Sequence, residues 1–321
     1  MTAAPAMIEV VAGILRDTSG RVLLAQRPPR GPHGGLWEFP GGKREPGETA
    51  SAALRRELRE ELGIEVEPGE PVWRVPWRYP HLAVALEAIS VHRHAGAPRG
   101  LEGQALAWVD LDELHRWPMP AADVPIAAAL RLPRGYAITP DPGLEAARLL
   151  ADARALLARG VRLLQLRAKS LPAAALATVL DAVRPAVEAA GAEVLVNGPV
   201  GLALAEAHPW IGVHLTAADL ARATARPLPR PRWVAASCHD AHEIARACAI
   251  GCDFVVVGPV LPTASHPGAA TLGWAGLARL ARDCAPPLFA LGGVGPADLD
   301  HARARGAFGV AGIRAFADGA P

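Results

Sequence analysis

The stretch GGKREPGETASAALRRELREELGI, residues Gly41 to Ile64, predicts a turn followed by an amphipathic helix. Pro46-Gly47 is a turn dipeptide, and Thr49 is well placed to cap a helix. The segment from Ala50 to Leu62 contains strong helix formers and neither Gly nor Pro. Its apolar residues recur at the spacing of one helical face: Ala50, Leu54, Leu58 and Leu62.

Three acids share another face of this predicted helix. Glu57, Glu60 and Glu61 stand at i, i+3 and i+4, so their carboxylates crowd together and resist ionising together. A hard divalent cation resolves that repulsion, and Mg²⁺ takes carboxylate oxygens together with substrate phosphates. Arg56 stands beside the acids and is placed to orient one of them. Taken alone, the three acids favour the alternative interpretation, a solvated charged face.

The spacing of the whole stretch reverses that preference, because it resembles the Nudix box. Gly42 is followed after five residues by Glu48, and the remaining specified positions come in order: Arg56-Glu57-Leu58, Glu60-Glu61 and Gly63-Ile64. The resemblance implies a loop-helix-loop that binds Mg²⁺, or Mn²⁺ in its place, and cleaves a nucleoside diphosphate linked to another group. It also implies the metal ligands, which are the carboxylates of Glu57, Glu60 and Glu61 and the carbonyl of Gly41.

Three further segments resemble the MutT branch, the 8-oxo-dGTP diphosphatases. They are the FPGGK segment Phe39–Lys43, the segment Glu102-Gly103-Gln104, and the loop Pro120–Ile126. The resemblance implies that Glu102 is a metal ligand or general base, although a solvated loop acid is the alternative. It also implies that Arg27 contacts the nucleotide and that Phe39 lines the base pocket.

Asp123 departs from the MutT pattern, which has an asparagine that reads the purine at this position. An amide both donates and accepts hydrogen bonds, whereas an ionised carboxylate only accepts. An ionised Asp123 would accept from the N–H groups of guanine, so a purine preference is retained. Adenine lacks that pair of donors, so dATP is expected to be a poor substrate.

Composition limits the class of protein. The 321 residues suffice for two domains, and the hydrophobic content of 51% suits sizeable cores. The net charge of +1 offers no general attraction to nucleic-acid polymers or membranes. Four cysteines are too few for a disulfide scaffold and suit a reducing cytosol. Neither a signal peptide nor a membrane-spanning run is expected, so a cytoplasmic location is predicted.

The N-terminal half is expected to be a mixed sheet flanked by helices, the α/β/α sandwich that the Nudix resemblance implies. The predicted strands are Met7–Leu15, Arg21–Ala25, Val72–Arg78, His81–His92 and Ala105–Val109, with short helices at Leu111–Leu114 and Ile126–Leu132. The segment Arg131–Gly135 contains Pro133 and Gly135 and is taken as the boundary. The predicted domains are therefore residues 1–132 and 133–321.

The C-terminal half alternates short apolar strands with helices and predicts a compact (β/α)₈ TIM barrel. Its eight predicted strands are Tyr136–Thr139, Arg162–Arg167, Glu193–Asn197, Ile211–His214, Trp233–Ser237, Phe254–Gly258, Leu288–Leu291 and Gly309–Gly312. Such barrels place their sites at the C-terminal ends of the strands. Backbone N–H groups after strands seven and eight, at Gly292-Gly293 and Gly312-Ile313, are expected to bind a phosphate, with glycines for tight turns as the alternative.

This half resembles the thiamine-phosphate synthase/TenI family over its whole length. The matching segments are Tyr136–Thr139, Gln165–Arg167 with Lys169, Val213–Leu215, Gly258–Val260 with Pro262-Thr263, and Leu291–Val294. The resemblance implies a barrel that binds a thiazole or thiamine phosphate. Gln165, Arg167, Lys169 and Asn197 are its expected ligand contacts.

Two departures argue against synthase activity. The family binds Mg²⁺ through an Asp that follows the third-strand Asn, but here Gly198 follows Asn197, and only Asp219 survives of the two acids. A family Lys has become His266. The Asn-Gly pair and His239 are more similar to TenI, a thiazole tautomerase in which a histidine moves the proton. A surface or helix-cap histidine is the alternative for His239.

Three hypotheses follow. The first is a Mg²⁺-dependent MutT-type pyrophosphohydrolase that converts 8-oxo-dGTP to the monophosphate and pyrophosphate, for nucleotide-pool sanitation, with Glu57, Glu60, Glu61 and Glu102 holding the metal. The second is a protein of thiamine metabolism, in which the barrel is a thiazole tautomerase and the Nudix half hydrolyses thiamine-type diphosphates. The third makes the barrel a non-catalytic binding module, with oligomerisation as one reason to keep it.

Overall fold

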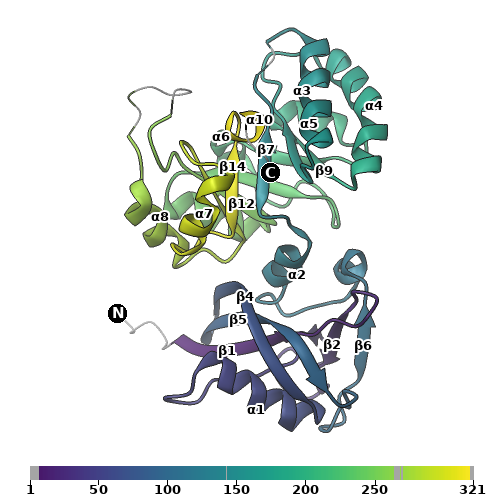
Figure 1. The fold of residues 1–321 in the computed structure, drawn as a ribbon, viewed down its shortest axis with the longest axis vertical. Helices are drawn as coiled ribbons and strands as arrows, with labels where there is room; N and C mark the ends of the chain where they lie inside the picture. Colours follow the sequence, from purple (N-terminus) through teal and green to yellow (C-terminus); the bar gives the residue numbers. More distant parts are fainter. Residues whose placement is uncertain (1–6, 142, 264–267, 269, 319–321) are drawn as a thin grey trace. The chain divides into compact units, whose positions relative to one another are not determined.

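The computed structural model describes residues 7–141, 143–263, 268 and 270–318. The chain forms two compact units, the first ending at Arg131 and the second beginning at Leu132. Each unit is shown in Figure 1 and is described by itself below. Within the described residues, no helix is long and apolar enough to cross a membrane.

The first unit is built from two three-stranded sheets with helices on both sides, which confirms the predicted mixed α/β architecture. In one sheet β5 lies between β1, to which it is parallel, and β4, to which it is antiparallel; in the other β2 lies between β3 and β6. Helices α1 and α2 lie on opposite sides of the sheets (Figure 1). The elements are β1 (Met7–Ile14), β2 (Val22–Gln26), β3 (Trp37–Glu38), α1 (Ala50–Leu62), β4 (Glu65–Tyr79), β5 (Leu82–Ala95), β6 (Leu106–Val109), the 3₁₀ helix η1 (Leu111–Arg116) and α2 (Val124–Arg131).

Helix α1 has the bounds that the sequence predicts. The Thr49 hydroxyl caps it by accepting from Ala52 N at 3.2 Å, and Gly63 ends it in the left-handed conformation, with φ of 66°. Its leucines are fully buried against strands of both sheets, in a cluster that includes Leu54, Leu58, Leu62, Val11, Leu23 and Ile89. This packing fixes the rotation of α1 and therefore fixes the direction of its acidic face.

The bounds expected for one strand are wrong, and the short helix expected from Leu111 is a 3₁₀ helix. Strand β4 begins at Glu65 rather than Val72, because the register shifts around Pro68 and Pro71 let the strand absorb residues that break a regular ladder. The Asp110 side chain makes no capping hydrogen bond, since η1 is a 3₁₀ helix in which Glu113 N bonds to the Asp110 carbonyl instead.

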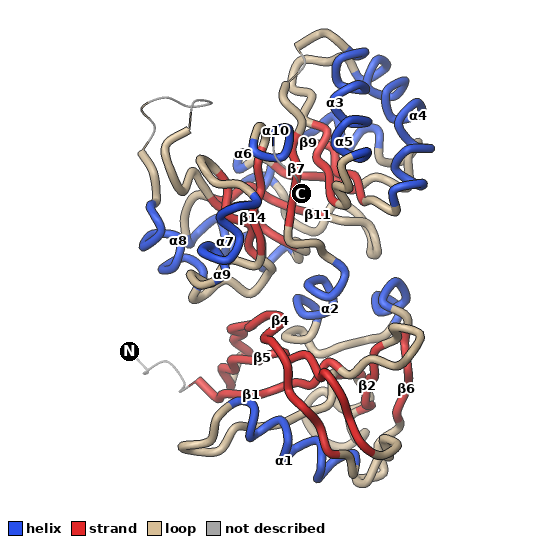
Figure 2. Tube along the Cα trace, viewed as in Figure 1, coloured by secondary structure: helices blue, strands red, loops and turns tan. Residues whose placement is uncertain are grey.

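The second unit is the predicted TIM barrel. Eight parallel strands close in the order β10-β11-β12-β13-β14-β7-β8-β9, and helices surround them (Figure 2). The strands are β7 (Gly135–Ile138), β8 (Leu163–Leu166), β9 (Glu193–Asn197), β10 (Gly212–Leu215), β11 (Val234–Cys238), β12 (Phe254–Val257), β13 (Leu288–Leu291) and β14 (Gly309–Gly312). The helices are α3 (Ala146–Ala158), α4 (Ala173–Ala190), α5 (Gly198–Leu204), α6 (Ala217–Arg222), α7 (Ala241–Ile250), α8 (Gly273–Ala281), η2 (Pro296–Asp298), α9 (Leu299–Arg303) and α10 (Ala315–Asp318).

The barrel interior is filled by aromatic rings rather than left as a channel. Tyr136, Phe254 and Phe289 are fully buried, and their ring centroids lie 5.3 to 6.0 Å apart in edge-on arrangements. Edge-to-face contacts of this kind are a preferred geometry for aromatic side chains. Ligand access is therefore expected at the ends of the strands and the loops that follow them rather than through the barrel.

Candidate functional site

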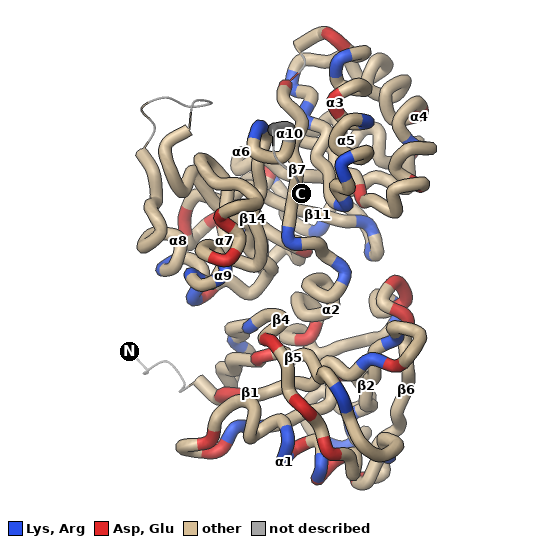
Figure 3. The backbone as a smooth tube through the Cα atoms, in the orientation of Figure 1, with Lys and Arg blue, Asp and Glu red and all other residues tan. Residues whose placement is uncertain are grey.

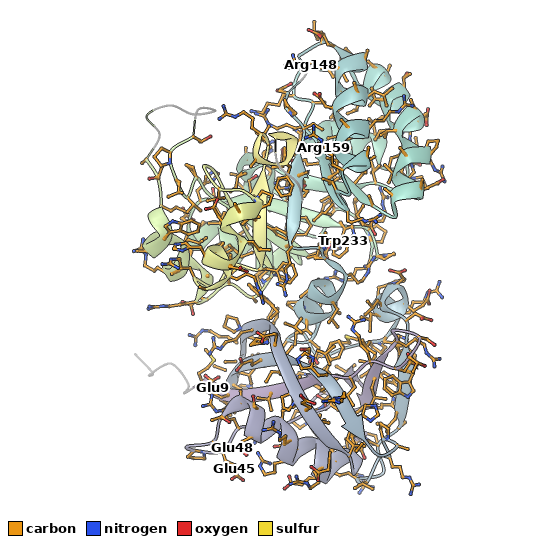
Figure 4. The ribbon with its side chains drawn as sticks, viewed as in Figure 1. Glu9, Glu45, Glu48, Arg148, Arg159 and Trp233 are labelled. Atoms are coloured by element: carbon orange, nitrogen blue, oxygen red, sulfur yellow. The ribbon has the colours of Figure 1, made fainter. Side chains whose placement is uncertain are left out.

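The acidic face of α1 lies against the loop that precedes it. Acidic and basic segments alternate along this helix in Figure 3, and Glu48 lies near its N-terminal end in Figure 4. An ideal Cβ at Gly42 would lie 2.3 Å from Glu57 Oε2, so the absence of a side chain at residue 42 makes the room that the Glu57 carboxylate occupies. Gly41 has a φ of 150°, which strongly favours glycine.

Arg56 neutralises much of the negative charge in this region. Its guanidinium bonds to Glu48 at 3.0 Å, Glu57 at 2.9 Å and Glu60 at 3.2 Å, and also donates to the Lys43 carbonyl at 3.0 Å. The expectation that Arg56 orients a carboxylate is therefore realised in the geometry. Through the same contacts, Glu57 and Glu60 are paired with a positively charged side chain of the protein itself, that of Arg56.

Hydrogen bonds from residues 101 and 104 hold the segment that carries Glu102 against the C-terminal end of α1. Leu101 N bonds to the Glu61 carbonyl at 2.9 Å, and Gln104 Nε2 bonds to the same carbonyl at 3.1 Å. Gln104 Oε1 also accepts from Glu102 N at 2.8 Å. These bonds satisfy carbonyls that the end of a helix leaves without partners, and they place Glu102 beside Glu61.

The crowding of these acids acts on the pKa of Glu61. Burial, together with the carboxylates of Glu57, Glu38 and Glu102, raises the pKa of Glu61 to about 8. The N–H of Gly41 donates to Glu61 and partly opposes the shift. A group of carboxylate oxygens is the ligand chemistry that Mg²⁺ or Mn²⁺ prefers.

The residues present thus fit a divalent cation, although they are not drawn together as ligands. Among the residues that the structure describes, no group of three or more His, Cys, Asp or Glu side chains is close enough to hold a metal ion. Glu57 and Glu60 are paired with Arg56 instead. The predicted metal ligands Gly41, Glu57, Glu60, Glu61 and Glu102 remain proposals.

The predicted nucleotide-binding residues meet on the other side of the FPGGK segment. Asp123 Oδ1 accepts from Phe39 N at 3.2 Å, across 84 residues of sequence. Both residues are buried, at 4% and 3% exposure. Arg27 lies nearby and pairs with Glu38 at 2.5 Å.

The expectation that Asp123 is an ionised, acceptor-only group is wrong. Burial raises its pKa to about 8, the charge of Glu38 adds to the shift, and the hydrogen bond from Phe39 only partly opposes it. At neutral pH the carboxyl is therefore protonated, and like an amide it can donate and accept. The predicted exclusion of adenine loses its basis, because adenine also presents a donor beside an acceptor.

Glu38 is a functional candidate that was not predicted from the sequence. Burial raises its pKa, while Arg27 lowers it, and its charge acts on both Glu61 and Asp123. It therefore lies near both the acidic cluster and the base-pocket residues. The sequence feature that could have indicated Glu38 is its position as the single acid inside the apolar run Leu36–Pro40, directly before Phe39.

In the barrel, the predicted contact residues gather at the C-terminal ends of the strands, but several are used by the fold itself. Asn197 Oδ1 accepts from Ala168 N at 2.9 Å, and Thr139 Oγ1 accepts from Arg167 N at 2.9 Å, so both shape the loop that carries the exposed Lys169. Gln165 is buried at 4% exposure. Gly312 ends β14, and Ile313 follows it.

Gly292 and Gly293 have positive φ angles of 95° and 66°. An ideal Cβ at Gly292 would lie 2.7 Å from Pro259 Cβ, and one at Gly293 would lie 2.7 Å from Leu261 Cβ. Tight turns and close packing thus require glycine at both positions, so the glycines alone do not indicate a phosphate site.

The barrel lacks the second acid of a metal site. An ideal Cβ at Gly198 would lie 3.7 Å from Asp219 Oδ2, so an acid at residue 198 would stand beside Asp219. Here Asp219 instead accepts from Thr216 Oγ1 at 2.7 Å and pairs with Arg222 at 2.7 Å. These residues do not fit a Mg²⁺ ion held by two aspartates. His266 lies outside the described residues.

His239 lies at the mouth of the barrel, directly after β11. Its Nδ1 lies 2.9 Å from Glu243 Oε2, and 57% of its side chain is exposed. Because the Glu243 carboxylate holds Nδ1, the other ring nitrogen, Nε2, is left to exchange a proton with a ligand, as in general-base pairs.

Comparison with known proteins agrees with this division into halves. Residues 11–129 match the NUDIX domain, and residues 135–316 match the thiamine monophosphate synthase family. The chain therefore belongs to both families, with a Nudix hydrolase domain of the MutT type fused to a thiamine-phosphate synthase-like barrel.

Three relatives illustrate the match. A CTP pyrophosphohydrolase of Escherichia coli is 45% identical over 123 residues, which is 38% of this chain and 90% of the relative. A putative thiamine-phosphate synthase of Geobacter sulfurreducens is 41% identical over 170 residues, 52% of this chain and 79% of the relative. An 8-oxo-dGTP diphosphatase of Haemophilus influenzae is 38% identical over 117 residues, 36% of this chain and 86% of the relative.

The metal assignment predicts a difference between two charge-matched variants. Glu57→Gln replaces a charged carboxylate next to Gly42 with a neutral amide. It should weaken Mn²⁺ binding by roughly tenfold or more, because hard cations are held by negatively charged oxygen ligands. Glu45→Gln removes the same charge from an exposed part of the same loop and should bind like the wild type. Isothermal titration of Mn²⁺ measures both, with circular dichroism to confirm folding. Equal affinities would remove Glu57 from the metal site.

Proposed function

We propose that the N-terminal unit is a divalent-metal-dependent nucleoside triphosphate pyrophosphohydrolase. Its proposed role is to hydrolyse 8-oxo-dGTP to 8-oxo-dGMP and pyrophosphate. The observation that carries the proposal is the arrangement on either side of the FPGGK segment. One side presents the acids of α1 with Glu102, and the other presents Phe39 and Asp123. A nucleotide needs both, because its phosphates and its base must be held at opposite ends.

Each group of residues has a proposed task. Glu57, Glu60, Glu61 and Glu102, with the Gly41 carbonyl, would hold the metal. The bound Mg²⁺ would neutralise phosphate charge and make water a better nucleophile. Glu102, on an exposed turn at the end of α1, would accept a proton from the attacking water. Arg27 would contact the nucleotide beside the base pocket.

A protonated Asp123 bears on the choice of base through the base edge that it contacts. It can pair with any base edge that presents one donor next to one acceptor. The N7–H and O6 of 8-oxoguanine form such an edge, whereas N7 and O6 of guanine are both acceptors. Cytosine offers N4–H and N3, so the name of the Escherichia coli relative, a CTP pyrophosphohydrolase, adds CTP as a second candidate substrate.

A substrate screen tests this proposal. The intact protein with Mg²⁺ should release pyrophosphate from 8-oxo-dGTP faster than from dGTP, and CTP should also be hydrolysed. Thiamine diphosphate, the substrate class expected for a protein of thiamine metabolism, should not be hydrolysed and serves as the comparison. Phosphate release from thiamine diphosphate, with no nucleotide hydrolysed, would contradict the proposal and support a role in thiamine metabolism.

The state of Asp123 predicts a pH dependence. Its folded pKa of about 8 lies above the usual value of 3.8 for an aspartate, so the proton is bound at pH 7 and lost as the pH rises through 8. At pH 9 about a tenth of the carboxyl stays protonated, so KM for CTP should rise roughly tenfold between pH 7 and pH 9. Asp123→Asn keeps a donor and an acceptor at every pH, so its KM should change less.

The comparison with Asp123→Asn also isolates this effect from the titration of Glu61, which both proteins share. Parallel KM profiles for the two proteins would contradict the assignment of Asp123 as the base-reading group.

For the barrel we propose binding of a heterocyclic phosphate ester without synthase activity. The observation that favours it is Asp219, which is paired with Arg222 while Gly198 offers no second acid. A pyrophosphate leaving group would therefore lack metal stabilisation. Tautomerisation needs only a proton shuttle, and the His239–Glu243 pair provides one.

The chain should accordingly fail to restore growth of a strain that lacks thiamine-phosphate synthase. It should convert thiazole carboxylate phosphate to its aromatic tautomer, and His239→Ala should slow this by roughly 10²-fold or more, the scale of general acid–base catalysis. His242→Ala, which removes an exposed histidine from α7, is the matched control. Growth rescue would contradict the first statement. Equal rates in wild type and His239→Ala would contradict the second.

A further inference from the structure

Three polar side chains form a continuous hydrogen-bonded chain inside the barrel. Tyr136 Oη lies 3.1 Å from His214 Nδ1, and His214 Nε2 lies 2.9 Å from Ser237 Oγ. The three residues come from β7, β10 and β11. Tyr136 and His214 are 0% and 3% exposed, whereas Ser237 is partly exposed. This series of hydrogen bonds, called the relay below, therefore runs from the aromatic core to a hydroxyl that a ligand can reach.

The first hydrogen bond has a defined direction. Burial raises the pKa of Tyr136 well above its usual value, so the phenol keeps its proton. Within the described residues, His214 Nδ1 is the sole hydrogen-bond partner of this hydroxyl. A buried O–H that did not donate would be left unsatisfied, which buried polar groups rarely are. Tyr136 therefore donates to Nδ1.

The second hydrogen bond follows from the first. Burial lowers the pKa of His214 to about 4, so the imidazole is neutral and carries one N–H. Because Nδ1 accepts from Tyr136, the proton lies on Nε2 and is donated to Ser237 Oγ. The Ser237 oxygen accepts in this pair, and its own O–H is left to donate. Over the described ranges, no acceptor for that O–H is present.

Ser237 lies near the C-terminal end of β11, the end at which barrels of this kind place their sites. His214 pairs in register with Ala235, so Ser237 lies two residues closer to the C-terminal end of β11. Gln165, near the end of β8, is 96% buried, and its side-chain amide makes no hydrogen bond within the part of the chain that is described. A buried amide and a hydroxyl with a spare donor at the same end of the barrel are typical of a ligand pocket.

We propose that Tyr136 and His214 are positioning residues that fix the Ser237 hydroxyl as a hydrogen-bond donor to an acceptor atom of a heterocyclic phosphate ester. The inference rests on the ligand binding proposed above for the barrel. The phosphate would lie at the loops after β13 and β14, and Ser237 would contact the heterocyclic end. Tyr136 and His214 act through Ser237 and do not touch the ligand.

The tautomer of His214 tests the relay without any ligand. Nitrogen-15 NMR of the full chain labelled at histidine should show a resonance with a protonated Nε2 and a bare Nδ1, unchanged from pH 6 to pH 8. His214→Gln assigns that resonance by its disappearance. A protonated Nδ1 would reverse both hydrogen bonds and overturn the proposal.

Binding tests the role of the donor. In calorimetric titrations of thiazole carboxylate phosphate, Ser237→Ala should bind roughly tenfold more weakly than the wild type, the upper range for one hydrogen bond. Ser237→Thr keeps the hydroxyl and should restore affinity. Tyr136→Phe should weaken binding although the ligand-contacting Ser237 is intact. Thr178→Ala, which removes a hydroxyl from α4, should bind normally.

The outcomes separate the relay from the function it serves. If Ser237→Ala binds the ester as tightly as the wild type, the relay has only a structural role and the proposal is overturned. If the wild type binds no thiazole carboxylate phosphate at all, the barrel function proposed above fails, and the assignment of Ser237 as a donor to such an ester fails with it.

Discussion

The repulsion among carboxylates at α1 is the constraint on which the N-terminal unit depends. Glu57, Glu61, Glu38 and Glu102 come from three different segments, and burial together with the charges of the other three raises the pKa of Glu61 to about 8. Arg56 offsets part of this charge. The buried leucine face of α1 keeps the acids from turning away, because rotation of the helix would expose that face. A site that must bind a cation gains from such stored negative potential.

In the barrel, hydrogen bonds rather than repulsion between charges decide which polar groups are left to bind a ligand. Asp219, a carboxylate that a metal ion would need, is paired with Arg222 and capped by Thr216, and Gly198 adds no second acid. What the barrel retains is a neutral polar set: Gln165, Ser237 and the buried Tyr136–His214 pair that orients Ser237. Neutral donors suit the recognition and isomerisation of a ligand better than the ionisation of a pyrophosphate ester.

Local patterns predicted most of the elements, because their causes are local. Helix α1 is bounded by a cap and a left-handed glycine, and both are visible in the sequence. Protonation of Asp123 was not predictable, since it results from burial that only the tertiary fold creates. The Tyr136–His214 bond joins residues 78 apart, and Glu38 lies in a strand of two residues, too short for any periodicity to reveal.

The central claim is that the acids of α1 form a divalent-metal site for phosphoanhydride cleavage. It is tested most directly by the anomalous scattering of Mn²⁺ in crystals of the full chain grown with a non-hydrolysable nucleoside triphosphate. An anomalous peak is expected within bonding distance of the Glu57 and Glu61 carboxylates, with the Arg56 guanidinium moved off Glu57. Absence of a peak at saturating Mn²⁺, with Arg56 still paired to Glu57 and Glu60, would contradict it.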